Sequence, residues 1–368
     1  MRYDAILFAS FGGPESLEEV MPFLERVTAG RGIPRERLEE VSHHYVTLGG
    51  ISPINKQNRE LVAALRSELL VQGINTPVYW GNRNSEPFFT HAFREMHADG
   101  HRKILAFVTS AYSSYSGCRQ YRENFAKSLD ETKLTNVLTI DKVRQYFDHP
   151  GFVIPFSNGL VEALEKLNGE GIDVSRTEIL FTTHSIPIAM AQTSGPSGQR
   201  ATLKNGTYVA QHNATAECVI EQARNLWAGE IPRWSLAYQS RSGAPQTPWL
   251  EPDIGQALRE LSNSGTSAVI VVPIGFVSDH IEVIWDLDHE AAEIARDLGL
   301  RFIRVATPGS SHAFVAGIVE LFKERLASAD RKALSTLGPW TDICAQDCCP
   351  NPRGDLPAVA QSAEFQRN

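Results

Sequence analysis

The sequence predicts an α/β protein made of two doubly wound (Rossmann-like) domains with parallel sheets. Short runs of β-branched and apolar residues alternate with longer amphipathic stretches along most of the 368 residues. Such alternation is typical of βαβ units, in which helices cover both faces of a parallel sheet. The length suits two domains, and 42% hydrophobic with 21% charged residues is an ordinary composition for a globular protein.

Eight segments have the length and composition of buried strands. They are 4–10, 77–82, 103–110, 136–140, 178–184, 233–239, 268–276 and 301–307. Five segments have the periodicity of helices, with apolar residues on one face. They are 58–70, 151–167, 214–227, 288–299 and 311–328.

The order of these segments predicts the domain organisation. We expect a first domain at 1–148 and a second at 149–310, joined in the helix that follows the turn at residue 148. A helix within 311–330 is expected to pack back on the first domain. The stretch 337–368, which is rich in Pro, Cys, Gly and polar residues, is expected to form an irregular extension.

Charge and hydropathy argue against several classes of protein. The formal net charge of −8 is not typical of a nucleic-acid-binding protein, which usually has a basic face. No apolar run approaches the roughly 20 residues of a membrane span. The N-terminus resembles a strand and not a secretory leader, so we expect a cytoplasmic protein, and we expect it to be a monomer.

His184 is the first candidate site residue. It ends an apolar strand, and ligands of parallel sheets bind beyond the carboxyl ends of the strands. A histidine there can accept a proton or bind a metal ion, but a lone histidine is as often structural. A functional role for His184 therefore requires partners.

Acidic residues after the strand 268–276 are the candidate partners. If a helix begins near Asp279, then Glu282, Asp286 and Glu290 lie at i, i+4 and i+8 on one helical face. Carboxylates stacked in this way repel one another, and a divalent cation would relieve the repulsion because hard cations prefer oxygen ligands. The alternative is a solvated acidic face, although the apolar neighbours of Glu282 indicate partial burial.

The predicted first domain carries aromatic and hydroxyl groups near its strand ends. Tyr45 and Ser52 flank a Gly-Gly turn, and Tyr121 follows the strand 103–110. Such groups suit a flat ligand with an apolar body and polar edges. No Gly-x-Gly-x-x-Gly motif follows the first strand and no P-loop motif occurs in the chain, which argues against a nucleotide ligand.

Six segments, in their order along the chain, resemble the ferrochelatase family. They are SFGGP (10–14), LGGISPIN (48–55), GNRNSEPF (81–88), FTTHSIP (181–187), YQSRSGAPQTPWLEP (238–252) and PIGFVSDHIEVIWDLDHE (273–290). The resemblance extends from about residue 3 to residue 325. Its most specific part is the combination of HSIP with GFVSDHIE.

This resemblance implies a ferrochelatase-like (chelatase) fold and the insertion of Fe²⁺, as substrate, into a porphyrin. In that reaction His184 would accept the pyrrole protons and contact iron, and Glu282 would assist metal delivery and proton transfer. Asp286 and Glu290 would form a relay that holds a hydrated cation or carries protons away. Within the family the sequence most resembles the actinobacterial type, which implies coproporphyrin III and not protoporphyrin IX as the macrocycle.

The resemblance also implies contacts to the porphyrin. Ser52 and Tyr121 match residues that meet the propionate groups, and Tyr45 and His44 lie in the matching loop. Some relatives have Tyr where this chain has Phe11. Because a phenyl ring cannot bind iron, we expect Phe11 to stack on the macrocycle.

Three cysteines near the C-terminus, Cys344, Cys348 and Cys349, have the spacing C-x3-C-C. Thiolates this close suit an iron–sulfur or a zinc site, and a fourth ligand would come from Cys218 or Cys118. The alternative is a set of free thiols. Several ferrochelatases carry a [2Fe-2S] cluster bound by C-terminal cysteines, so the resemblance favours that cluster, and we expect Cys218 as the fourth ligand.

Two other functions stay open at this point. One is a chelatase for another tetrapyrrole or metal, such as protoporphyrin IX or cobalt. The other is a non-catalytic tetrapyrrole-binding protein or iron–sulfur sensor on the same fold. The acidic residues that accompany His184 favour catalysis, because a sensor would not need them.

Overall fold

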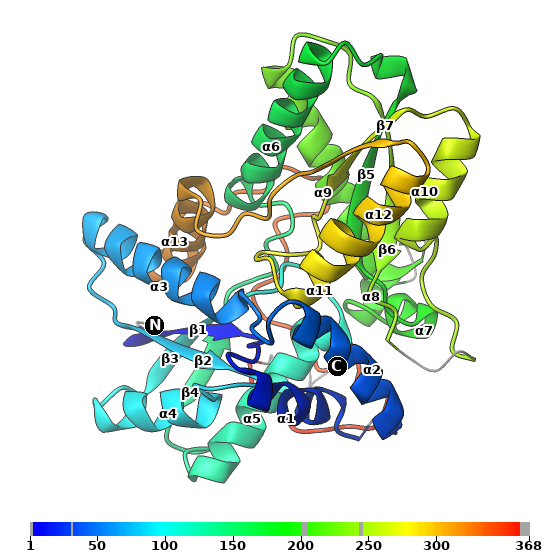
Figure 1. Cartoon of the computed structure of the whole chain (residues 1–368). Coiled ribbons are helices and arrows are strands. Elements are labelled where there is room, and N and C mark those ends of the chain that lie inside the picture. Colours follow the sequence, from blue (N-terminus) through cyan, green and yellow to red (C-terminus); the bar gives the residue numbers. More distant parts are fainter. Residues whose placement is uncertain (1–2, 31, 201–202, 204, 243–245, 361–368) are drawn as a thin grey trace.

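The computed structural model describes residues 3–30, 32–200, 203, 205–242 and 246–360. Within these residues the strands form two four-stranded parallel sheets with helices around them (Figure 1). The predicted α/β fold with two doubly wound sheets is therefore confirmed. The last eight residues of the expected extension lie outside the described residues.

The first sheet has the strand order β2-β1-β3-β4. Its strands are β1 (Ala5–Ser10), β2 (Val78–Asn82), β3 (Lys103–Val108) and β4 (Thr139–Lys142). Every residue of β1 is buried, because a central parallel strand is covered by helices on both faces and is apolar throughout. The strands β1, β2 and β3 fall within predicted segments, and β4 overlaps the predicted segment 136–140 but ends two residues later.

The helices of the first half include several that the sequence pattern did not predict. They are α1 (Leu17–Thr28), α2 (Arg35–Thr47), α3 (Ile54–Val71), α4 (Phe89–Ala98), the π-helix η1 (Tyr115–Arg119) and α5 (Gln120–Thr132). Only α3 corresponds to a predicted segment. The pair α1 and α2 packs together and carries residues of the candidate site.

The second sheet has the order β6-β5-β7-β8. Its strands are β5 (Thr177–His184), β6 (Arg233–Gln239), β7 (Ala268–Val272) and β8 (Arg301–Arg304). The helices are α6 (Pro150–Gly169), η2 (Val174–Arg176), α7 (Ile188–Gln192), α8 (Ser197–Arg200), α9 (Gly206–Leu226), α10 (Ile254–Asn263), α11 (Ile281–Val283), the π-helix η3 (Ile284–Ala291), α12 (Ala292–Asp297) and α13 (His312–Leu326).

Helix α13 packs against both α6 and α3. Phe107 of β3 contacts Phe314 and Phe322 of α13, with ring centroids 6.3 and 6.4 Å apart. One apolar core extends from the first sheet through these rings to the second sheet. No helix in the described part of the chain is long and apolar enough to span a membrane.

The segment after β7 differs from the single α-helix expected near Asp279. A short α11 leads into η3, whose hydrogen bonds follow the wider i→i+5 pattern, and then into α12. The π-helical turn explains why Trp285 and Glu290, five residues apart, are hydrogen-bonded from the indole Nε1 to Oε1 at 2.7 Å.

Candidate active site

His184 is held at the end of β5 by the segments beside it. The amide of Ser185 donates to the carbonyl of Gln239 at 2.7 Å, and the Ser185 hydroxyl donates to the carbonyl of Leu250 at 2.9 Å. From behind, the Tyr208 hydroxyl donates to the carbonyl oxygen of His184 itself at 2.8 Å. These bonds fix the backbone that carries the imidazole.

The backbone also selects the tautomer of His184. Its Nδ1 lies 2.5 Å from the carbonyl oxygen of Ser185. A carbonyl oxygen can only accept a hydrogen bond, so Nδ1 carries the proton when the ring is neutral. Nε2 then presents a lone pair, which can accept a proton or bind a metal ion.

Glu282 approaches His184 from the segment after β7. Gly275, at the start of this segment, packs closely against β5, because a Cβ on it would lie 2.7 Å from the Cα of Thr183. The Glu282 Oε2 lies 3.9 Å from the His184 Nε2, with side chains 46% and 32% exposed. The two predicted partners therefore meet, and both remain accessible to a ligand.

His280 is a further member of this group that was not among the predicted site residues. Its Nδ1 lies 3.9 Å from the same Glu282 oxygen. Burial lowers the pKa of His280, and the charges of Glu282 and Asp279 act in the opposite direction. The crowding of imidazoles and carboxylates around Glu282 in the sequence was the signal that could have identified it.

The acidic residues of η3 continue from Glu282. Asp286 accepts hydrogen bonds from the Ser240 hydroxyl and from the Gln239 amide. Burial raises the pKa of Asp286 to about 7, and the charges of Glu282 and Glu290 contribute to this rise. The charges of the three carboxyl groups therefore influence one another, although the π-helix η3 replaces the single α-helix from which their stacking was predicted. Asp286 can exchange a proton near neutral pH.

Helix α2 of the first half lies against this segment. Tyr45 is buried in an apolar cluster with Ile281, and the pKa of its hydroxyl is raised by burial and by the charge of Glu282. The ring of His44 stacks on Trp285 at 4.2 Å with an interplanar angle of 8°. Tyr45 and His44, which were expected in a loop, thus lie in helix α2 and pack beside α11 and η3.

The other predicted substrate residues lie in the first half, where Phe11 and Tyr121 flank Arg83 and the amide of Ser52 donates to the carbonyl of Pro14. The Arg83 guanidinium lies over the ring of Phe11 at 5.4 Å and over that of Tyr121 at 5.2 Å. Tyr121 and Ser52 are almost fully buried, whereas Phe11 is partly buried beside Phe23. Arg83 was not predicted, although it lies in the quoted segment GNRNSEPF.

A second group of side chains gathers four of the five cysteines. The Cys118 Sγ lies 3.9 Å from the Cys344 Sγ, and the Cys348 Sγ lies 3.8 Å from the Cys349 Sγ. All four are buried in one cluster. Cys118 belongs to η1, which follows β3, and the C-terminal extension crosses there.

The expectation that Cys218 joins these thiols is corrected by this arrangement. Cys218 lies in α9 and packs in the main apolar core, whereas Cys118 lies beside the C-terminal cysteines. Spacing along the chain could not distinguish the two, because the choice depends on where the extension docks. The described residues contain no group of three or more His, Cys, Asp or Glu side chains arranged to hold a single metal ion.

The distances fit two pairs of sulfur ligands. At metal–sulfur bonds of about 2.3 Å and tetrahedral geometry, two thiolates on one metal lie about 3.8 Å apart. Both observed sulfur–sulfur distances are close to that value. Two pairs are what a [2Fe-2S] cluster requires, since each of its irons takes two thiolates.

Several curated proteins are similar to this chain over nearly its whole length. The protein called Coproporphyrin III ferrochelatase in Leifsonia xyli is 53% identical, over 98% of this chain and 94% of its own length. Those of the same name in Streptomyces griseus and Tropheryma whipplei are 50% and 49% identical, over 97% and 96% of this chain and 96% and 90% of their own lengths.

Among solved structures, SirB from Bacillus subtilis with Fe³⁺ aligns at a TM-score of 0.45 and 11% identity, over 89% of this chain and 97% of that chain. The family model described as Ferrochelatase matches residues 3–326, which include both sheets, His184 and Glu282. The chain therefore belongs to the ferrochelatase family.

Proposed function

We propose that this protein inserts Fe²⁺ into coproporphyrin III to give the iron porphyrin, as a step of haem biosynthesis. The observation that carries the proposal is the pairing of His184 Nε2 with Glu282 Oε2, which lie 3.9 Å apart and are both accessible. His184 ends β5, and Glu282 lies in α11, in the segment that follows β7. The family membership and the names of the similar proteins support the same reaction.

Metal insertion exchanges two pyrrole protons of the macrocycle for one Fe²⁺, so the site has to remove protons and also receive the ion. The His184 Nε2 is the proton acceptor and contacts iron, because Nδ1 is committed to the Ser185 carbonyl. Glu282 assists by receiving the metal ion and by stabilising the imidazolium that forms at 3.9 Å.

The acidic residues of η3 then act as a path for protons or for a hydrated cation. Asp286, whose pKa lies at about 7, can take up and release a proton at physiological pH. Glu290 lies one turn further along the helix and keeps its carboxyl group near the surface through its bond to Trp285. Ser52, Tyr121, Tyr45, His44 and Phe11 are the proposed porphyrin contacts.

The activity is tested with the purified protein, coproporphyrin III and Fe²⁺ under anaerobic conditions, followed by the absorbance of the iron porphyrin. We expect insertion by the wild type and a loss of at least a hundredfold in kcat for His184→Ala, since a general base contributes about 10²–10⁴-fold. Equal rates for the variant and the wild type would remove His184 from the mechanism. A parallel assay with protoporphyrin IX and with Co²⁺ separates the proposed substrate pair from other chelatase activities.

We also propose that Cys118, Cys344, Cys348 and Cys349 hold a [2Fe-2S] cluster. The paired sulfur distances and the burial of all four thiols support it. The cluster would be structural or regulatory, because metal insertion involves no net electron transfer. We expect brown protein whose visible absorbance is lost in Cys118→Ser and kept in Cys218→Ser; a colourless protein with stoichiometric zinc would contradict the proposal.

A further inference from the structure

We propose that Arg122 and Lys142 are built-in counter-charges of the four-cysteine site, and that they raise the reduction potential of the cluster held there. The inference rests on the [2Fe-2S] cluster proposed above. An oxidised cluster with two Fe³⁺ ions, two sulfides and four thiolates has a net charge of −2. Two buried cations without carboxylate partners lie beside the cysteines.

Arg122 is the first of these cations. It lies in α5 and is fully buried. Its Nε donates to the carbonyl of Val359 at 2.9 Å, but Nη1 and Nη2 are buried without a hydrogen-bond partner among the described residues. The sulfur atoms of all four cysteines interact electrostatically with its guanidinium group. A buried guanidinium with two unsatisfied nitrogens is costly unless an anion faces it.

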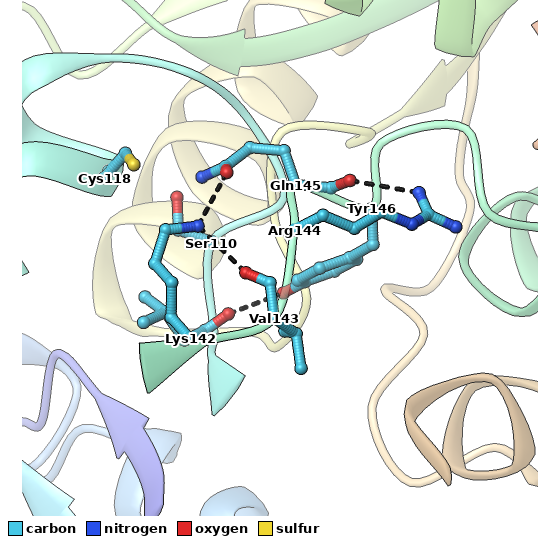
Figure 2. A pocket seen from close by; sticks show the side chains of 9 residues that line it. Ser110, Cys118, Lys142, Val143, Arg144, Gln145 and Tyr146 are labelled. Carbon is cyan, nitrogen blue, oxygen red and sulfur yellow. Dashed lines mark hydrogen bonds between the residues drawn. The ribbon is translucent and has the colours of Figure 1, made fainter. Parts of the chain in front are cut away.

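Lys142 is the second cation and lies at the end of β4. Its side chain is almost fully buried, and its Nζ donates to the Val143 carbonyl at 2.9 Å and to the Gln145 side chain at 2.8 Å. Both partners are neutral. Figure 2 shows these bonds and the Cys118 sulfur, which lines the same cavity of about 10 Å³, enough for about one water molecule. The charge of Lys142 acts on Cys118.

Two other buried arginines of this protein are each paired with a carboxylate. The Arg119 Nε lies 3.1 Å from Glu123, and the Arg144 Nε lies 2.8 Å from Glu324. Each is buried, and each has a buried carboxylate as partner. Arg122 has no such partner among the described residues, and the groups whose negative charge would act on its guanidinium are the four cysteine sulfurs.

Counter-charges of this kind favour the reduced cluster, because reduction adds one negative charge next to fixed positive ones. The test is a redox titration of the purified holoprotein, followed by visible absorbance and by electron paramagnetic resonance of the reduced state. We expect Arg122→Met and Lys142→Met each to shift the reduction potential to more negative values. Arg122→Lys keeps the charge and should keep a potential close to that of the wild type.

The matched control is Lys127→Met, which removes an exposed charge from the same helix and should leave the potential unchanged because solvent screens it. Brown holoprotein with the wild-type potential in both Arg122→Met and Lys142→Met would overturn the counter-charge proposal alone. A wild type without an iron–sulfur cluster would overturn the cluster assignment and this inference with it.

A second measurement keeps the proposal testable if Arg122→Met does not retain the cluster. In a Cys348→Ser background, which lacks the cluster, Arg122→Met should leave the urea unfolding midpoint unchanged or raise it, because an uncompensated buried cation is removed. In the holoprotein the same substitution should lower the midpoint. If Arg122 is only a packing residue, the midpoint falls equally in both backgrounds, which would contradict the proposal.

Discussion

The imidazole of His184 is positioned by a hydroxyl that lies behind it. Tyr208 is buried in α9, and its hydroxyl bonds both the carbonyl of His184 and the hydroxyl of Thr183. His212, one turn along α9, completes the arrangement through a 2.8 Å contact from its Nε2 to Thr183. Buried residues of α9 therefore help to hold the backbone that carries the imidazole of His184.

Loss of the Tyr208 hydroxyl should slow the reaction without preventing binding. In Tyr208→Phe we expect kcat to fall roughly five- to tenfold with little change in KM, because the positioning bond is worth about 1 kcal/mol. The measurement is steady-state kinetics of porphyrin metalation. Tyr146→Phe is the matched control, since that buried hydroxyl donates to the Val108 carbonyl in the first sheet and should alter stability but not kcat. A change in KM alone for Tyr208→Phe would contradict a positioning role.

At the scale of single elements, the π-helix η3 determines the spacing of the acidic residues. Its wider turn brings Trp285 and Glu290 together, while Asp286 turns inward to Ser240 and Gln239.

The start of helix α6 depends on a single histidine side chain. It begins after His149, whose Nδ1 accepts a hydrogen bond from the amide of Gly151 and so caps the helix.

His149 should make the stability of the protein depend on pH. Burial lowers the pKa of His149 to about 3, with the charges of Arg144 and Lys332 adding to the effect. In the unfolded chain the imidazole takes up a proton below about pH 6.5. The unfolded state then binds more protons than the folded state, so stability falls as the pH drops from about 6.5 towards 3.

The variant His149→Asn keeps a side-chain acceptor for the cap and removes the titrating group. When the pH falls from 7 to 5, we expect the free energy of unfolding to drop by about 2 kcal/mol more in the wild type than in the variant. Urea unfolding at the two pH values measures this difference. Parallel pH profiles of the variant and the wild type would show that His149 does not contribute to the acid sensitivity.

At the scale of the whole molecule, the two sheets are joined through α13 and through the C-terminal extension. The extension links the halves at Cys349, whose sulfur accepts a hydrogen bond from the amide of Gly195 at 3.1 Å. Ser194, which precedes Gly195, accepts a hydrogen bond on its hydroxyl from the amide of Tyr208 at 2.7 Å. The sulfur site and His184 thus share one supporting segment.

The crossing of α13 over α6 depends on two glycines. A Cβ on Gly317 would lie 2.8 Å from the Cα of Gly151. We expect Gly317→Ala to lower the free energy of unfolding by about 1–3 kcal/mol, because overpacking at a backbone contact forces the helices apart. Gly169→Ala, at the end of α6 with open space around it, is the control and should be neutral. Chemical denaturation measures both, and equal values would show that the crossing tolerates a wider separation.

Much of the fold was predictable because each strand has its own local signal. All eight predicted strands are present, since β-branched apolar runs of this length are typical of buried parallel strands. Helix α1 was missed although Val20, Phe23 and Leu24 form an apolar stripe, because Pro22 inside the segment is more typical of a helix end. Helix α2 gives a weaker signal, since it is rich in charged residues and buries only Leu38 and Tyr45. The pairing of His184 with Glu282 followed from the rule that ligands bind at strand ends.

The features that sequence did not predict depend on contacts between distant segments. Cys118 was not preferred over Cys218, because the docking of the extension on η1 leaves no local pattern. Arg83 was missed for a similar reason, since the rings that it covers, Phe11 and Tyr121, come from other segments. His280 is different, because it lies two residues from Glu282 and the local pattern could have identified it. The domain boundary near residue 148, the cytoplasmic location and the monomeric state stay predictions.

The stacking of His44 on Trp285 has a consequence for how a porphyrin enters the site. Helix α2 and η3 touch through these rings and through the burial of Ile281 beside Tyr45. If the macrocycle contacts both Tyr45 and His184 as proposed, these rings would separate before it enters, and an opening motion would gate its uptake. The observed rate of porphyrin uptake in stopped-flow quenching should level off at a plateau as concentration rises, and Trp285→Ala should raise that plateau.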